Sequence, residues 1–179
     1  MSKMTITEAL AEIKLIEKKA EKKRQTVGAN LVRYEHVKDP FESDGGSKVA
    51  MKREVQSIGD LENQLVKIRS AIAKANIETT LTVGEQTKSV YDWLTWKREV
   101  SEKQVQFFKH VYENIKHQID KQATNPQVFK TEEGQVQVAK LSYNLEYADF
   151  LSASQKLSDT LETLDGKLSL KNATVMVDV

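Results

Sequence analysis

Apolar residues recur over long stretches of this sequence in alternating steps of three and four residues. One such series runs from Ile58 to Ala75, and another runs from Tyr147 to Leu168. This spacing is the a/d pattern of a coiled coil, in which an apolar stripe along one helix is buried against another helix. A chain with several such stripes is therefore expected to form long helices that pack antiparallel at a shallow angle.

Local signals mark the ends of these long helices. Ser89 is a typical N-cap for the middle one, whose apolar stripe includes Val100 and Phe108. The residue before Pro126 resists helical geometry, so this helix is expected to end just upstream. Three helices of about 30 residues are predicted in this way. Their ranges are 47–76, 90–122 and 141–170.

A shorter helix precedes them. Thr5 and Glu8 form an S/T-x-x-E capping box at its start, and Gly28 is its expected end. The stretch 29–46 is predicted to be a loop, because it holds an Asp-Pro pair and an S-D-G-G run. In its first half, 29–37, apolar and polar residues partly alternate, which is typical of a short extended segment. The loop is long enough to be a functional or subunit-contacting segment, or simply a mobile one.

Small β-structures separate the long helices. Residues 79–88 and 127–139 each place β-branched or alternating residues on both sides of a glycine turn, which predicts two β-hairpins. The tail from Asn172 is expected to be a closing strand. With 179 residues, the chain fits a single elongated domain, 1–179. The predicted fold is mainly α: an antiparallel helical bundle or coiled coil of three long helices, a shorter N-terminal helix, two hairpins and a C-terminal strand.

Composition excludes several classes of function. Lys and Arg number 27 against 26 Asp and Glu, so the net charge of +1 lacks the basic excess of a nucleic-acid-binding protein. The absence of cysteine excludes disulfides, thiolate zinc sites and cysteine catalysis. No apolar run approaches the roughly 20 residues of a membrane span, and the first residues lack the apolar core of a secretory signal. We therefore expect a protein of the cytoplasm or of an assembled particle, not one secreted through a signal peptide.

Motifs for chemistry are scarce. His110, Glu113 and His117 share one face of the middle long helix and are the weak candidates for a metal site. A di-iron bundle would require a second Glu-x-x-His motif, and the neighbouring long helices contain no histidine. The sequence has no G-x-S-x-G elbow and no phosphate-binding glycine motif. We therefore predict no catalytic residue, no cofactor and no small-molecule substrate.

Aromatic residues concentrate in the same helix. Trp93 and Trp96 cannot both share a narrow stripe with Leu94 and Val100, so at least one is a candidate interface residue. Plain core packing is the alternative for both. A basic cluster, Lys18 to Arg24, could meet an anionic surface, although cations at a helix C-terminus also have a structural explanation.

Several short motifs resemble the septicolysin-like family of small helical bacterial proteins. The resemblance covers nearly the whole chain in its order of long helix, small hairpin and closing segment. It implies no known activity or catalytic residues, and the family's toxin-like name implies pore formation. The motifs are T-E-A-L-A-E from Thr7, N-L-V-R from Asn30, I-A-K-A-N-I-E-T-T-L from Ile72, L-D-G-K-L from Leu164, and Asn172-Ala173-Thr174.

The sequence thus predicts a non-enzymatic structural or assembly protein. Such a protein would self-associate into a homo-oligomer or contact neighbouring subunits of a larger particle, for example the virion of a bacteriophage. Two alternatives remain open. One is a metal-dependent helical-bundle enzyme, and the other is a membrane-active protein like the septicolysins.

Overall fold

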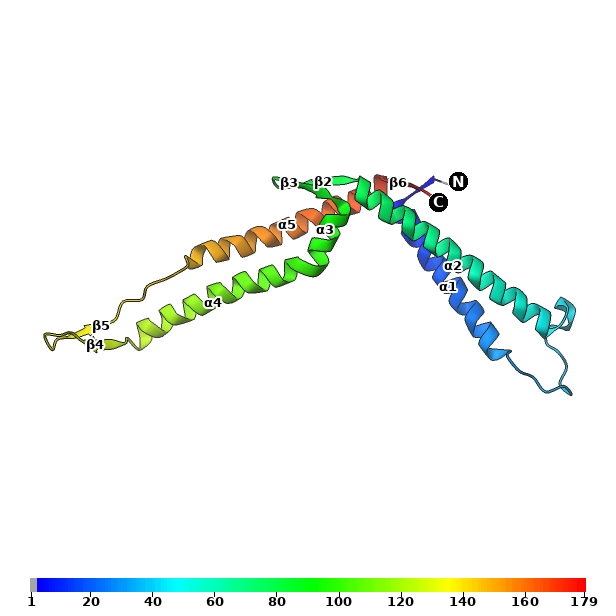
Figure 1. Cartoon of the computed structure of the whole chain (residues 1–179), viewed down its shortest axis with the longest axis horizontal. Helices are drawn as coiled ribbons and strands as arrows, with labels where there is room; N and C mark the ends of the chain where they lie inside the picture. The colour runs from blue at the N-terminus through cyan, green and yellow to red at the C-terminus, as the bar shows by residue number, and fades with distance from the viewer. Residues whose placement is uncertain (1–2) are drawn as a thin grey trace. The chain divides into compact units, whose positions relative to one another are not determined.

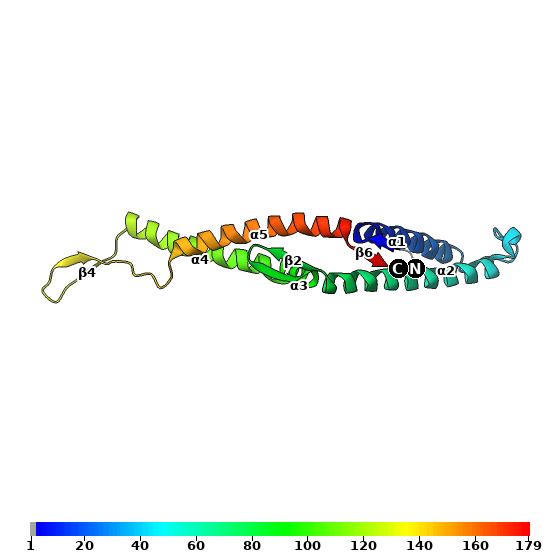
Figure 2. The same cartoon turned by 90° about the horizontal axis from the view of Figure 1, so that it is seen from above.

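The computed structural model describes residues 3–179 and is mainly helical (Figures 1 and 2). It has four helices, three of them long and one shorter at the N-terminus, and three small two-stranded antiparallel sheets. These features confirm the predicted fold class. The chain divides into two compact units: unit 1 holds the chain up to Thr80 together with Leu168–Val179, and unit 2 is Leu81–Lys167. The expectation of a single domain over 1–179 stays a prediction.

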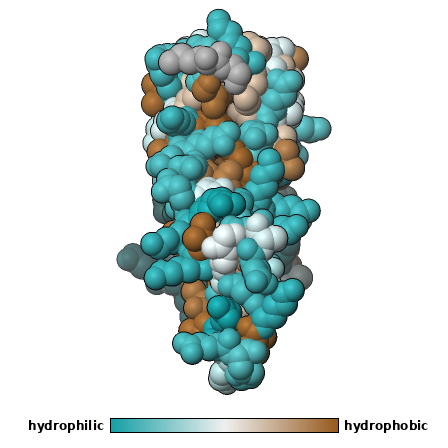
Figure 3. Space-filling view, turned by 90° about the vertical axis from the view of Figure 1, so that its right-hand side faces the viewer, coloured by the Kyte–Doolittle hydropathy of each residue, from teal (hydrophilic) through white to brown (hydrophobic). Residues whose placement is uncertain are grey.

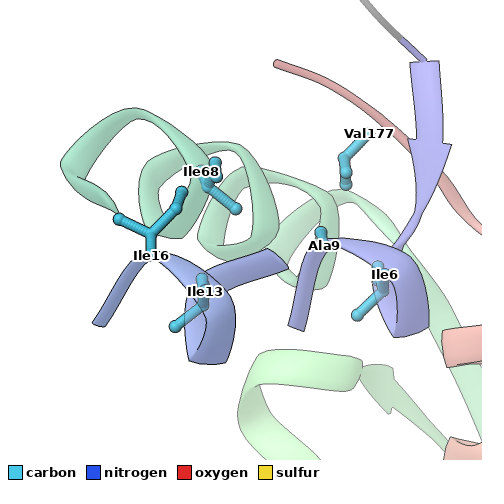
Figure 4. Close-up of a cluster of buried hydrophobic side chains, with 6 residues drawn as sticks. All are labelled: Ile6, Ala9, Ile13, Ile16, Ile68 and Val177. Carbon is cyan, nitrogen blue, oxygen red and sulfur yellow. The ribbon is translucent and has the colours of Figure 1, made fainter. Parts of the chain in front are cut away.

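Unit 1 is built on two antiparallel helices, α1 (Ile6–Ala29) and α2 (Ser47–Glu78). Ion pairs at 2.6 Å join them from Glu17 to Arg69 and from Arg24 to Glu62. Because these pairs are half exposed, they set the register of the helices more than they stabilise the fold. The core lies between the helices and the C-terminal strand (Figure 4), and its buried members are Ile6, Ala9, Ile13, Ile16, Ile68 and Val177.

A two-stranded sheet closes one end of unit 1. Strand β1 (Lys3–Thr5) pairs antiparallel with β6 (Met176–Asp178), with Met4 opposite Val177. The closing strand was predicted from Asn172, but the last helix continues to Thr174, so the strand is shorter than expected. The partner strand β1 was not predicted from the sequence.

The start of α1 was predicted correctly and its end was not. The backbone N–H of Thr5 donates to Glu8 Oε2 at 2.7 Å, and Thr5 Oγ1 accepts from the Glu8 N–H at 3.2 Å. The hydrogen bond from the Thr5 backbone lowers the pKa of Glu8. Gly28 lies inside the helix with an ordinary negative φ. Asn30 ends the helix instead, because its side-chain amide donates to the Thr26 carbonyl at 2.8 Å.

The connection from α1 to α2 contains one short 3-10 turn, η1 (Glu42–Asp44), and no strand, so the extended piece expected at 29–37 is wrong. Asp39 organises the second half of this connection. Its carboxylate accepts the backbone N–H groups of Phe41 and Ser47, each at 2.9 Å. The bond to Ser47 lies at the first residue of α2, where helical N–H groups lack partners. The Ser47 hydroxyl also donates to Asp39 Oδ1. This bond first, then the backbone bonds from Ser47 and Phe41, lower the pKa of Asp39 from 3.8 to about 2.

Acid is expected to loosen this helix start. A carboxylate with a lowered pKa stabilises the folded state at pH values above its ordinary pKa, and that stabilisation is lost as the pH falls from about 4 through about 2. The hydrogen-exchange protection factor of the Ser47 amide should therefore drop over this range. Asp39→Ala should lower it already at neutral pH, whereas Asp44→Ala in the same loop should not. Equal protection in both variants would contradict this role for Asp39.

Unit 2 begins with the hairpin of β2 (Thr80–Val83) and β3 (Gln86–Ser89), which confirms the hairpin predicted at 79–88. Ser89 then caps α3 (Val90–Trp96), its Oγ accepting the Asp92 N–H at 3.0 Å. The helix continues through a π turn, η2 (Lys97–Ser101), into α4 (Glu102–Thr124).

The π turn corrects the predicted stripe of this helix. Val100 was expected on the buried stripe, but it is 40% exposed and Ser101 is buried in its place. A π turn holds one extra residue, so the helix rotates and positions beyond it change face. The Ser101 hydroxyl donates to the Lys97 carbonyl at 2.8 Å, which satisfies this buried polar group inside the turn.

The second half of unit 2 is the hairpin of β4 (Val128–Lys130) and β5 (Val136–Val138), followed by α5 (Tyr147–Thr174), which belongs to unit 1 from Leu168 onward. The hairpin confirms the prediction at 127–139. The last helix was predicted from residue 141, but residues 141–146 are not helical. Gln122 Nε2 donates to the Ala139 carbonyl at 2.7 Å, which ties the base of the hairpin to the end of α4. Leu141–Leu145 then line a groove with α4, and this tertiary contact replaces helix formation there.

Candidate self-association surface

The part of unit 2 that carries α4, the β4–β5 hairpin and the first half of α5 has almost no core. No residue from Glu102 to Thr163 is buried. The buried residues of unit 2 all lie on the β2–β3 hairpin, on α3 and η2, and at the far end of α5, as for Val90, Trp93 and Leu164. The helix pair of unit 1 buries Ile16 and Ile68, whereas the apolar stripes of α4 and α5 stay half covered or exposed along this stretch. The residues 102–163 therefore form a candidate surface for association.

Aromatic side chains line this surface between α4 and α5. The rings of Phe107 and Phe108 lie 6.4 Å and 5.9 Å from the ring of Phe150, both in edge-on geometry. Tyr112 lies 6.0 Å from Tyr147. Phe107 nevertheless remains 56% exposed. These contacts hold the two helices antiparallel while leaving apolar area open to solvent.

A groove extends the surface toward the hairpin. It encloses about 380 Å³ and is lined by Val111, Ile115 and polar side chains of α4 on one side. The extended segment Leu141–Leu145 forms the other side. Leu141, Tyr143 and Leu145 are between 40% and 50% exposed.

The β4–β5 hairpin is open on both faces. Its register pairs Val128 with Val138, Phe129 with Gln137, and Lys130 with Val136. Every residue of both strands is exposed, and Val136 is 63% exposed. An isolated two-stranded hairpin is marginally stable in water, so this element gains from any further strand or packed surface.

Unit 1 carries a further set of exposed apolar residues near the connection of its helices. Figure 3 faces this end and shows apolar side chains between polar ones. Val27, Leu31, Met51 and Val55 line a groove of about 540 Å³ there, together with Arg33 and other polar residues. Val32 and Tyr34, in the same connection, are 89% and 77% exposed.

Trp93 and Trp96 lie in unit 2 at the base of its helices. Trp93 is 2% exposed, and its indole N–H donates to the Leu81 carbonyl at 2.8 Å. Trp96 is half-buried, meets Trp93 edge-on at 5.6 Å, and donates to Gln104 Oε1 at 3.0 Å. Trp93 thus occupies the core position that the sequence left open as an alternative. An interface role for the exposed edge of Trp96 stays a prediction.

His110, Glu113 and His117 are all exposed on α4. His110 shares a hydrogen bond of 2.8 Å with Asn114, and Glu113 pairs with Lys109 at 3.8 Å. Within residues 3–179, no three His, Asp or Glu side chains gather closely enough to hold a metal ion. The basic cluster also has protein partners, since Lys23 pairs with Glu54 at 2.6 Å.

Comparison with known proteins adds no family: no family model, curated protein or solved structure matches this chain. The septicolysin-like resemblance therefore stays a prediction. Among the described residues, no helix combines the length and the apolar character needed to cross a membrane.

The sequence contained part of the signal for this surface. The apolar stripes of α4 and α5 were predicted at Phe108, Phe150 and Leu157, and the structure places all of them at half-buried positions. The incomplete burial itself could not be predicted, because it depends on which helix each stripe meets. The Leu141–Leu145 segment was predicted as helix, although its apolar residues Leu141, Tyr143 and Leu145 recur in steps of two, the spacing of an extended segment.

Proposed function

We propose that this chain is a non-enzymatic structural protein that assembles with copies of itself, as in an oligomer or a larger particle such as a virion. The observation that carries the proposal is the absence of any buried residue from Glu102 to Thr163, although this stretch holds two apolar stripes. Two such helix pairs can cover each other's stripes in the manner of a four-helix bundle.

A second copy suits this surface better than a strongly charged partner. The surface carries both signs of charge, as in the Lys109–Glu113 pair. With a net charge of +1, copies of the chain do not repel one another strongly. The apolar area at Phe107, Leu141 and Leu151 is contributed equally by both copies in a symmetric interface.

Native mass measured over a range of concentrations tests the proposal. The unmodified chain should form a defined oligomer at micromolar concentration. Ile115→Lys should raise its dissociation constant by about 10-fold or more, because an interface that buries this side chain would have to bury a charge. His117→Lys adds the same charge at an exposed position two residues away and serves as the control. A chain that remains monomeric at high concentration would refute the proposal.

A further inference from the structure

We propose that the free edge of β5 pairs with β5 of a second copy, antiparallel and about a two-fold axis at Gln137. The two hairpins would then form one sheet in the strand order β4-β5-β5-β4. This inference rests on the self-association proposed above and names the segment through which copies join. It follows from the backbone geometry, the strand sequence and the charges of this hairpin.

The backbone of β5 presents unpaired groups at the right positions. The Thr131 N–H donates to the Gln135 carbonyl at 2.9 Å, and the Ala139 N–H donates to the Gln127 carbonyl at 2.7 Å. Because hydrogen-bonded and non-hydrogen-bonded pairs alternate in an antiparallel ladder, Val128 opposite Val138 and Lys130 opposite Val136 are non-hydrogen-bonded pairs. The N–H and C=O groups of Val136 and Val138 therefore point away from β4.

The strand is self-complementary in this register. A two-fold axis at Gln137 places Val136 opposite Val138 of the second copy, and Val138 opposite Val136 of that copy. Both pairs then exchange N–H···O bonds, about four in total, with no outward group of β5 left over. This is strand addition to an exposed sheet edge, with an identical strand as the added one.

The side chains agree with the pairing. Val128, Val136 and Val138 share one face of the hairpin with Lys130. Each row across the axis then holds Val128, Val138 and Val136 of the second copy, and ends at Lys130 of that copy. Gln137 faces Gln137 of the second copy on the other face, with Phe129 on each side. Val136 and Val138, the exposed apolar side chains of β5, would each gain a cross-strand neighbour on the second copy.

The β4 edge of the hairpin is protected against pairing with a further strand, and the β5 edge is not. Strand β4 carries Lys130, whose backbone groups point outward, and it follows Pro126, which lacks an N–H for a ladder. Charged lysine and proline are the features by which natural sheets block edge pairing. From Gln135 to Ala139 the β5 edge has neither a charge nor a proline. Pairing through β5 is thus the pairing that this sequence leaves open.

Charge complementarity supports the antiparallel orientation. The turn of the hairpin carries Glu132 and Glu133, and the residue that follows β5 and Ala139 is Lys140. In the proposed register, Lys140 of the second copy lies opposite Gly134, directly beside this acidic turn. The symmetry repeats the contact on the other side of the axis. A parallel pairing in register would instead bring the two acidic turns together.

Cysteine cross-linking tests the register directly, because the natural chain has no cysteine. Residues directly opposite in a non-hydrogen-bonded pair have Cα atoms about 4.5 Å apart, a distance that a disulfide spans. The full-length Gln137→Cys variant should form a disulfide dimer under mild oxidation at least about 10-fold faster than Phe129→Cys. Phe129 is the matched control, since it lies opposite Gln137 on β4 and shares its face.

A pair of proline variants tests the hydrogen bonds. Val138→Pro removes an outward N–H from the β5 edge without removing a bond of the hairpin, and it should weaken self-association by about 10-fold. Val128→Pro makes the same change at the opposite residue on the β4 edge, where Val128 is 61% exposed against 56% for Val138. This variant should change the dissociation constant of self-association by less than about 3-fold. Equal helical circular dichroism in both variants checks that the chain remains folded.

The outcomes separate this inference from the proposed function. Fast cross-linking of Gln137→Cys with weakened association of Val138→Pro supports the β5 pairing. Similar cross-linking rates for the two cysteine variants, or faster cross-linking of Phe129→Cys, overturn it. If the unmodified chain assembles and Val138→Pro assembles equally well, the β5 pairing is wrong and self-association stands. If the unmodified chain is monomeric, both proposals fall.

Discussion

Trp93→Ala is expected to lower the free energy of unfolding of unit 2 by about 3–5 kcal/mol, the range for removal of a large buried aromatic side chain. Trp93 is 2% exposed, and its indole N–H satisfies the carbonyl of Leu81 in the β2–β3 hairpin. The substitution therefore leaves both a cavity and an unpaired buried carbonyl. Because unit 2 has few buried residues, little remaining core can compensate.

Urea unfolding followed by tryptophan fluorescence measures this effect, since Trp96 remains as a probe within unit 2. Tyr91→Ala is the matched control: Tyr91 is an aromatic residue of the same helix but is 49% exposed, so the loss should be about 1 kcal/mol or less. Trp93→Phe should fall between the two, because the ring is largely retained and the hydrogen bond is lost. Equal destabilisation by Trp93→Ala and Tyr91→Ala would show that Trp93 does not hold the unit together.

Ile68→Ala should have a comparable effect on unit 1. Ile68 has no exposed area and is the buried α2 member of the core cluster, which also contains Ile13 and Ile16 of α1 (Figure 4). Truncation of a fully buried isoleucine costs about 2–5 kcal/mol, depending on how far the neighbouring side chains close the cavity.

Hydrogen exchange of the α1 and α2 amides provides the measurement, because both tryptophans lie in unit 2 and do not report on unit 1. Ile77→Ala is the control: it makes the same change in the same helix at a residue that is 60% exposed, and should cost less than about 1 kcal/mol. Protection factors that fall equally in the two variants would argue against a core centred on Ile68.

Much of the secondary structure could be predicted because it depends on local chemistry. Several of these signals involve only residues a few positions apart in the sequence. They are the capping box at Thr5, the cap at Ser89 and the glycine turns of the two hairpins. The a/d stripes also located the long helices correctly. Each of these signals is complete within a short window of sequence.

Two of the errors have long-range causes, and the misplaced end of α1 has a local one. The strand β1 is stable through its pairing with β6, whose residues lie at the other end of the chain. The end of α1 at Asn30 rather than at Gly28 reflects a side-chain cap that competes with the glycine signal. Leu141–Leu145 follow α4 instead of forming a helix. The pairing of β1 with β6 and the contact of Leu141–Leu145 with α4 both join segments that are distant in the sequence.

The sequence indicated that apolar stripes would be available for association, but not where on the molecule they would remain exposed. The abundance of apolar stripes and the lack of reactive motifs led to the hypothesis of self-association. The sequence could not show that residues 102–163 would be the stretch without a buried residue, nor that β5 would present an uncharged edge. Both depend on which segments become neighbours once the chain folds.

The π turn at Lys97–Ser101 has a consequence for how this region can vary. One residue of an α-helix corresponds to about 100° of rotation about the helix axis. The extra residue in the turn therefore sets the direction in which Phe108 and its neighbours leave the axis and meet Phe150. An inserted or deleted residue between Trp93 and Phe108 would change both the length of this helix and the direction in which Phe108 points. This stretch should therefore accept substitutions far more readily than insertions or deletions.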